Sequence, residues 1–325
     1  SNSRQRRVKE PILMLNHFWS LSRSTKINTN VAYQFGHIGN TRIDYGGTNL
    51  VRFNDEVSYE GGGQNPDPAY YQNLPSYFLR SEGRENYEAA YKSAAAFREN
   101  GQLNWQAIYD ANMAETNNGN NAVYALTADR YDDHSMYLNA IVDHTINAMF
   151  KLNGGINFRH LQSHNYAKID DLFGANHFLD IDFFAEPIND YSLEQVAQSD
   201  VQNPNRLVSQ GDIYKYNYDL NATSLQAFSQ LQFATKNIET YFSANVSSTS
   251  YERFGNYQNG LFPDNSLGRS KELNFIDFGL KSGITYHFTG RHSVSSNLFF
   301  ASNPPTLQNS FANPRQNNTV VQDLD

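Results

Sequence analysis

Cysteine is absent from the 325-residue sequence, which excludes a disulfide framework and any metal site built on thiolates. No apolar run reaches the roughly 18 residues of a membrane-spanning helix, so such a helix is excluded as well. Basic residues number 25 against 33 acidic ones, and the formal net charge is −8. Nucleic acid is therefore not expected as a partner, because its phosphates are bound by clustered Lys and Arg. The one dense basic run, residues 4–9, is expected to be a solvated loop.

Aromatic residues are plentiful. They make up 14% of the chain, with 21 Tyr and 22 Phe, yet the mean hydropathy is −0.64. This combination is unusual for a compact globule. It suits a transmembrane β-barrel, in which the lumen and the loops are polar and the outer band is apolar and bordered by aromatic girdles.

The clearest pattern is a strict two-residue alternation in residues 225–247, on both sides of a short turn at 234–237. Successive side chains of a strand point to opposite faces of the sheet. One face is therefore nearly apolar, with Leu225 and Phe242 among its members, and the other is mostly polar, with Gln226 and Gln232. The pattern predicts an antiparallel hairpin with one apolar face.

Residues 12–35, 136–159 and 278–300 repeat this pattern, and the apolar set of all the hairpins contains no Asp, Glu, Lys, Arg, Asn or Gln. Lys or Arg in the middle of a bilayer costs about 2–4 kcal/mol, so we interpret the apolar set as facing lipid and the other set as facing the lumen. The residues expected to face the lumen include Lys151, Arg159, Gln230, Glu239, Asn245 and Lys281. This interpretation would be wrong if Leu231, Phe242, Leu280 and Leu298 lay buried together between two stacked layers.

The sequence therefore predicts an all-β fold, an antiparallel transmembrane β-barrel segment with long extracellular loops that contain short helices. About eight strands are expected, as part of a larger barrel, because a closed eight-stranded barrel fills its interior with its own side chains. The long loops are expected at about residues 36–130, 163–211, 253–270 and 302–325.

Helices are expected within these loops. One covers residues 86–98, a second covers 104–114 with Asn104 as its N-cap, and a short one begins at Ser192, with Gln195 completing a capping box. No signal peptide is recognisable in residues 1–30. We therefore expect either a processed chain or a fragment of a longer protein.

Residues 301–321, ASNPPTLQNSFANPRQNNTVV, contain a short motif. Pro305, Thr306, Leu307 and Phe311 resemble the Pro-x-Leu and Phe/Tyr segment of TonB-dependent outer-membrane receptors, in which an inward strand end runs into a loop rich in Asn and Pro. Asn303-Pro304 departs from the basic residue and Ala that are common there. In its overall pattern the chain resembles a middle piece of the barrel of the large Bacteroidota receptors, without the plug or the C-terminal strands.

The resemblance implies a barrel of about 22 strands with a plugged lumen. Such a receptor lies in the Gram-negative cell outer membrane with its loops extracellular, and takes up a scarce ligand such as a siderophore, an oligosaccharide or a peptide. The partners implied are outer-membrane lipid, the plug domain of the same receptor and, through the plug, TonB, with a surface lipoprotein as a further candidate. The residues expected in the lumen would then face the plug.

Aromatic side chains of the loops and the upper lumen are the candidates for ligand contact, because Tyr and Trp combine apolar contact with a polar group. The alternative is that they pack loops against each other or form the upper aromatic girdle. No hydrolase, phosphate-binding or dinucleotide-binding motif is present, so we expect no enzyme and no cofactor. The candidates are Trp105, Tyr109, Tyr214, Tyr216, Tyr218 and Tyr257.

No metal site is expected. His160 and His164 have the spacing of a helical zinc pair, but on a strand they would lie about 13 Å apart and could not share an ion. The acidic segments 132–133 and 180–182 do not follow the calcium-loop pattern and are expected to be solvated.

Two other functions are compatible with the sequence. One is a non-transporting outer-membrane barrel that acts as an adhesin or a structural protein, and the other is a soluble all-β binding module. A plug domain and a TonB box upstream would favour transport, and solubility without detergent would favour the soluble module.

Overall fold

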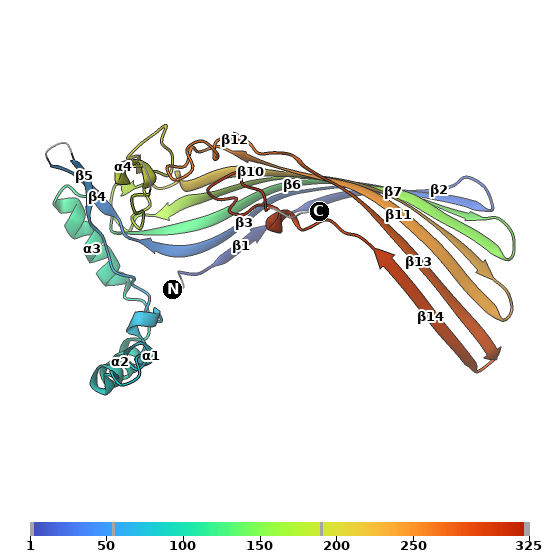
Figure 1. Ribbon diagram of the computed structural model, residues 1–325, viewed down its shortest axis with the longest axis horizontal. Helices are drawn as coiled ribbons and strands as arrows, with labels where there is room; N and C mark the ends of the chain where they lie inside the picture. The colour runs from blue at the N-terminus through green and yellow to red at the C-terminus, as the bar shows by residue number, and fades with distance from the viewer. Residues whose placement is uncertain (1–2, 54–55, 189–190, 322–325) are drawn as a thin grey trace.

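Figure 1 shows one large, curved antiparallel sheet with the long connections gathered at one end. The computed structural model describes residues 3–53, 56–188 and 191–321; residues 54–55, 189–190 and 322–325, which fall in the expected loops, lie outside the described part. Strands that follow each other in the sequence pair with each other in the sheet. They are β1 (Arg6–Lys9), β2 (Ile12–Ser20), β3 (Thr25–Tyr45), β6 (Tyr124–Thr145), β7 (Phe150–Asp171), β10 (Ile213–Ala234), β11 (Ile238–Gly255), β13 (Leu273–Thr289) and β14 (His292–Ala301), with the short β12 (Gly268–Arg269) beside β11.

The first edge of the sheet is one strand that is interrupted at Glu10 and Pro11. Both β1 and β2 pair with β3 along the same edge, and Pro11 has no amide hydrogen to continue the ladder. Opposite the interruption, Gly36 has a φ of 138°, and a Cβ there would lie 1.9 Å from the carbonyl oxygen of Lys9. The basic run 4–9 is thus mostly strand, where the sequence predicted a loop, because it pairs with β3.

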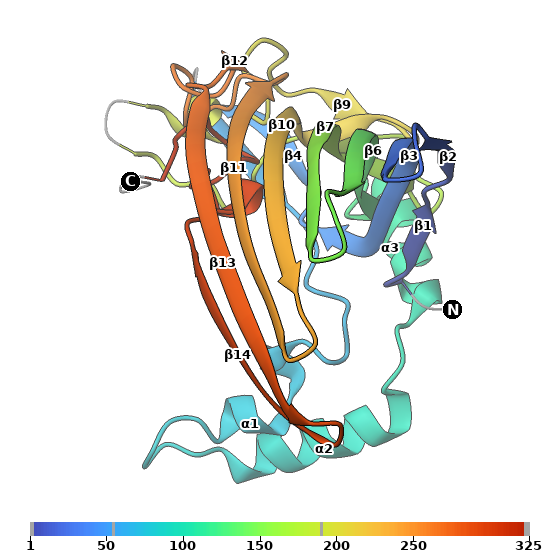
Figure 2. The same ribbon diagram turned by 90° about the vertical axis from the view of Figure 1, so that its right-hand side faces the viewer.

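Counting β1 and β2 together, the sheet has the expected eight strand positions. Its order is a simple meander from β1 and β2 at one edge to β14 at the other (Figure 2). Among the described strands none pairs with the free side of either edge, so the sheet is not closed.

The two ends of the sheet differ, as the sequence predicts. Short turns at residues 21–24, 146–149, 235–237 and 290–291 lie at one end, and the long connections lie at the other (Figure 1). The long connections contain β4 (Thr48–Phe53), β5 (Glu56–Gly61), η1 (Tyr71–Asn73), α1 (Pro75–Phe78), α2 (Tyr87–Asn100), α3 (Trp105–Asn117), β8 (Phe178–Leu179), α4 (Leu193–Val196), β9 (Leu207–Val208) and η2 (Leu307–Asn309).

The expected helices are confirmed. α2 begins after Asn86 and α3 after Asn104, and each Asn side chain accepts a backbone hydrogen bond from the third residue after it. Ser192 caps α4 in the same way by accepting from the Gln195 amide. Within the described residues, no helix is both long enough and apolar enough to cross a lipid bilayer.

The strands are longer than the alternation predicts. β3 continues to Tyr45 and β6 starts at Tyr124, where a loop was expected at 36–130. Likewise β7 runs to Asp171, into the expected loop 163–211. The reason is that outward positions beyond the apolar segments become polar, for example Asp132, so the alternation fades although the backbone pairing continues.

The apolar set is exposed on the outer face of the sheet. Leu231 is 41% exposed, Phe242 55%, Leu280 43% and Leu298 73%. They are therefore not buried between two layers, which is the arrangement that would have contradicted the membrane interpretation.

The opposite, inner face carries a row of hydrogen-bonded amides. Asn30 of β3, Asn139 of β6, Asn157 of β7 and Gln226 of β10 occupy paired positions, and each Asn donates a side-chain hydrogen bond to the next amide in the row. An amide offers both a donor and an acceptor, so such a row satisfies its own members. The polar set predicted from the sequence thus forms an ordered network.

Candidate ligand-binding site on the inner face

Residues 302–321 cover the inner face near the end with the long connections (Figure 1). Arg253 of β11, which is 2% exposed, holds this segment by donating to the carbonyl oxygen of Pro314 (2.6 Å) and to the Asn318 side chain (2.5 Å), and it also donates to the carbonyl oxygen of Ser266 (3.0 Å) in the preceding loop. Burial lowers the pKa of Arg253 to about 10. Neutral acceptors therefore compensate a buried charge, and the segment is fixed over the sheet.

Three tyrosines of β10, Tyr214, Tyr216 and Tyr218, lie buried on this face. The register with β7 shifts between Tyr214 and Asn217, and Lys215 within this bulge has a φ of 68°. Bulges redirect side chains in this way. The Tyr214 hydroxyl donates to Asp44 at 2.9 Å, and the Tyr216 hydroxyl donates to an aspartate of β6 at 2.6 Å. Burial, together with these carboxylates, raises the pKa of both hydroxyls, so they remain protonated donors.

Each of the two carboxylates also has a cationic partner. The Lys215 ammonium lies 3.0 Å from Asp44, and the Arg315 guanidinium lies 3.6 Å from Asp129 and 4.7 Å from the ring centre of Tyr216. Burial alone would raise the pKa of Asp44, but Lys215 and the hydrogen bonds lower it, so this carboxylate is charged at neutral pH. The result is two linked ion pairs on the inner face, which we call the ion-pair cluster.

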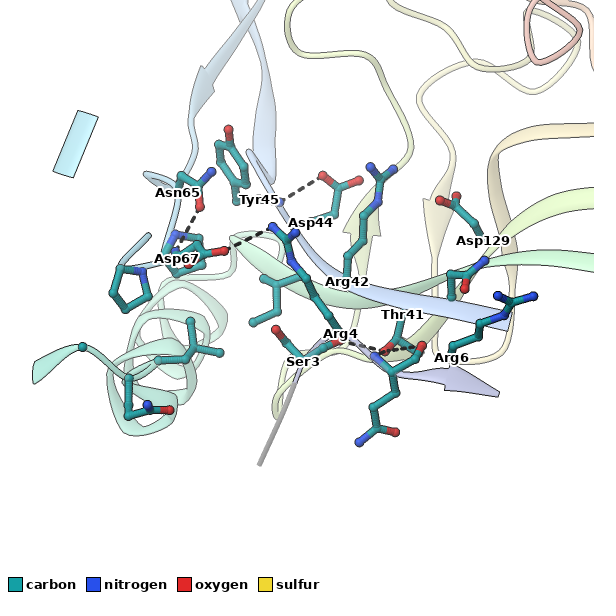
Figure 3. Close-up of a pocket in the computed structure, with 18 residues that line it drawn as sticks. Ser3, Arg4, Arg6, Thr41, Arg42, Asp44, Tyr45, Asn65, Asp67 and Asp129 are labelled. Atoms are coloured by element: carbon teal, nitrogen blue, oxygen red, sulfur yellow. Dashed lines mark hydrogen bonds and ion pairs between the residues drawn. The ribbon is translucent and has the colours of Figure 1, made fainter. Parts of the chain in front are cut away.

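A cavity of about 1110 Å³ opens beside the ion-pair cluster (Figure 3). A second cavity, of about 480 Å³, is lined by Lys215, Tyr216 and Arg315 together with Phe184 and Asn313. Ligand pockets commonly measure about 300–1000 Å³, so both have room for a small molecule. The charged residues that line the larger cavity are Arg4, Arg6, Arg42, Asp44, Asp67 and Asp129.

The structure divides the six aromatic candidates between two places. Tyr216 lies against Arg315 of residues 302–321, Tyr218 lies against Arg253, and Tyr214 packs on Phe178. The Tyr257 hydroxyl, near the same end of β10, accepts from Arg206 and donates to the Ile213 carbonyl. Trp105 and Tyr109 of α3 pack on Phe173, with ring centroids 5.8 and 5.4 Å away. For this second pair, loop packing accounts for the contacts that the structure shows.

The six polar residues expected in the lumen share the face of the amide row. Arg159 lies 5.4 Å from the Tyr137 ring, Lys281 lies 5.8 Å from the Tyr241 ring, and Glu239 lies 3.5 Å from His287. They are Lys151, Arg159, Gln230, Glu239, Asn245 and Lys281.

The four residues that resemble the receptor motif lie in residues 302–321, the segment that covers the inner face. The Pro305 carbonyl accepts from Tyr251, Thr306 precedes η2, and Leu307 packs against the buried cluster that includes Phe311. These residues build the cover over the tyrosines and do not line the larger cavity.

Sequence reasoning missed the charged members of the site. Arg42 and Asp44 continue the inner set of β3, and Asp129 continues that of β6, so a two-residue count carried past the apolar segments would have found them. Lys215 and Arg315 give no such signal, because one lies in a bulge and the other in a segment outside the sheet.

Metal-ligand geometry is not found in the described part of the chain, where no group of three or more His, Asp or Glu side chains is placed to hold an ion. His160 and His164 bond to different side chains of β10, at 2.9 and 2.7 Å. Asp132 pairs with Arg130; Asp180 is buried, where the sequence predicted a solvated position, because it pairs with Arg206 and accepts from Ser199.

Comparison with known proteins does not place the chain in a family. No protein-family model matches it, and the search of curated proteins found no match. The arrangement of side chains on the two faces is therefore what a functional argument can use.

Proposed function

We propose that the chain is part of an outer-membrane β-barrel that binds a scarce ligand and takes it up in the manner of a TonB-dependent receptor. One observation carries the proposal: the apolar side chains are exposed on the outer face, and the polar side chains are ordered on the inner face. A water-filled barrel in lipid requires this distribution, and a soluble sheet requires the opposite one.

The height of the exposed apolar band supports the membrane assignment. On β10 the band extends from Leu225 to Phe233, and on β7 from Phe150 to Phe158. Nine residues span about 30 Å along a strand, and a strand tilt of roughly 40° reduces this to about 23 Å, close to the apolar band of about 25 Å in outer-membrane barrels.

Aromatic side chains border the band. Near the turns, Phe150 and Phe233 have ring centroids 4.9 Å apart, and at the other border Tyr33 and Phe35 are 5.5 Å apart. Girdles of this kind mark the two lipid–water interfaces of membrane barrels.

The size of the exposed surface argues against the soluble binding module. Phe278, Leu280, Ile284, Leu298 and Phe300 on β13 and β14 are 43–73% exposed. Leu225, Leu231, Phe242, Val246 and Ile276 on the neighbouring strands are 41–81% exposed on the same face, and soluble monomers rarely expose a contiguous apolar patch of this kind.

The inner face favours uptake over adhesion. The ion-pair cluster and both cavities lie on or beside the inner face, behind the long connections, where a ligand that enters the lumen from outside would meet them. The long connections would then admit the ligand, and the polar inner strands would contact the plug.

Two measurements on the complete protein test the proposal. The first is fractionation of the cells, in which the protein should enter the outer-membrane fraction and need detergent for extraction. The second is capture of the extracted protein by the purified periplasmic domain of TonB. Extraction without capture would favour the adhesin, and recovery from the aqueous fraction would reject the membrane assignment altogether.

A further inference from the structure

Among the described residues, two arginines of the larger cavity lie within ion-pair distance of no carboxylate, although the charge of Arg42 helps to lower the pKa of Asp44. Arg6 of β1 pairs in register with Asn40 of β3, so Arg42, two residues further along β3, is its diagonal neighbour on the inner face. Diagonal neighbours lie about 7–8 Å apart, within reach of long side chains. Within residues 3–53, 56–188 and 191–321, neither guanidinium forms an ion pair or a hydrogen bond, and the buried Nε of Arg42 has no acceptor.

The carboxylates that could neutralise them are engaged elsewhere. Asp44 accepts from Lys215, Tyr214 and its neighbouring amide, and Asp129 is paired with Tyr216 and Arg315. In Figure 3 the Arg42 side chain stands between Asp44 and Asp129, and Arg4 is directed to Asp67, with which it forms an ion pair.

The local charge is consequently positive. The charged residues that line the cavity are three arginines and three aspartates, which balance in number, but Lys215 and Arg315 pair with Asp44 and Asp129 from outside the lining, so the group as a whole has two positive charges in excess. The chain as a whole has a net charge of −8. A local excess of the opposite sign beside a cavity attracts small anions and raises their concentration there.

The missing partner has a definable chemistry. A guanidinium presents a planar fork of donors that fits the oxygens of a carboxylate or a phosphate. The Nε of Arg42 is buried without an acceptor, which is costly, and an incoming oxyanion removes that cost, while Arg6 is exposed and adds a second set of charged donors. The cavity, at about 1110 Å³, is much larger than an oxyanion alone and has room for an organic body attached to it.

We propose that this cavity binds the oxyanion group of a small organic anion, held between Arg6 and Arg42. Uptake of this anion rests on the proposed transport function. Binding of the anion depends on the inner face alone and can be measured on extracted protein.

The test is equilibrium binding by calorimetry on the complete protein in detergent. The probes are glucose 6-phosphate, glucuronate and uncharged glucose. At least one of the two anions should bind, and glucose should bind at least ten-fold more weakly. Binding of only the phosphate ester or only the carboxylate identifies the oxyanion source. Absence of binding by both anions, or equal binding of glucose, overturns the proposal.

Three variants identify the site. Arg6→Gln and Arg42→Gln should each weaken anion binding about ten-fold or more, since each removes charged hydrogen bonds. Arg7→Gln is the matched control, because Arg7 is next in sequence but pairs with Asp170 instead of pointing into the cavity, and it should leave affinity unchanged. An equal loss in all three variants overturns the assignment.

The variants also separate this proposal from the transport function. Removing an unpaired charge should leave the thermal unfolding temperature unchanged or higher, and the variants should still enter the outer membrane and be captured by TonB. Capture by TonB without anion binding would reject only the binding site. Anion binding without capture would reject only the transport function.

Discussion

A lysine on the outer face of the sheet tests the central physical argument. Leu231 is 41% exposed and is flanked by Leu152 on β7 and Phe242 on β11. It lies two residues from Ser229, the middle of the apolar band on β10. Lys at the bilayer midplane costs about 2–4 kcal/mol, and the cost falls toward the interfaces. For Leu231→Lys we expect about 2 kcal/mol, or roughly a 30-fold loss in the folding equilibrium.

The matched control is Gln230→Lys, one residue earlier on the same strand. Gln230 is half-buried on the inner face, where a lysine remains in water. Surface substitutions in water usually change stability by less than about 0.5 kcal/mol. The same small value would apply to Leu231→Lys if the outer face were in water.

The assay is reversible urea unfolding of the complete protein in phosphatidylcholine vesicles, followed by tryptophan fluorescence, to which Trp19 and Trp105 contribute. Leu231→Lys should unfold at a clearly lower urea concentration than Gln230→Lys. Equal midpoints for the two variants, with both proteins folded in vesicles, would refute the assignment of the outer face to lipid.

Three further predictions follow from particular contacts. Arg253→Met removes two hydrogen bonds to residues 302–321 and a third to Ser266, and it should increase the rate of tryptic cleavage within residues 302–321 at least ten-fold, whereas Arg269→Met, an exposed position, should not. Burial, with the nearby carboxylate, raises the pKa of Tyr216, so the protonated hydroxyl stabilises the folded state fully below pH 10, and this contribution is lost as the pH rises above 10. In urea titrations at alkaline pH, Tyr216→Phe should therefore lose less stability than the unsubstituted protein. An unchanged pH slope would contradict this. Gly36→Ala should cost about 2 kcal/mol or more and speed amide exchange in residues 37–40, whereas Gly290→Ala, with nothing within 4 Å of its Cβ, is the neutral control.

The sequence was sufficient for the hairpins because their two faces have different surroundings. Leu231 and Gln230 alternate for that reason, and the structure confirms the turn between β10 and β11. The helix starts at Asn86 and Asn104 were equally predictable, since an N-cap is decided within one helical turn.

The ion-pair cluster could not be predicted in the same way. Asp44 and Lys215 are 171 residues apart in the sequence, and they meet because of a bulge in β10 that has no simple local signal. Arg253 appears in the sequence as one more charge on an alternating strand, and its burial depends on a cover formed by residues 302–321. The resemblance to TonB-dependent receptors stays a prediction.

The inner face gives the strongest reason to prefer uptake to adhesion. An adhesin uses its external loops, so its inner face needs only to be filled, and apolar side chains would fill it at less cost than buried charges. Here the inner strands instead carry linked amides such as Asn139, two ion pairs, and Arg42 with a buried donor that has no acceptor. Buried polar groups without partners are rare in folded proteins and call for a functional explanation. In the proposed barrel, a polar ligand that enters the lumen would supply the missing acceptor, and a purely structural interior would not.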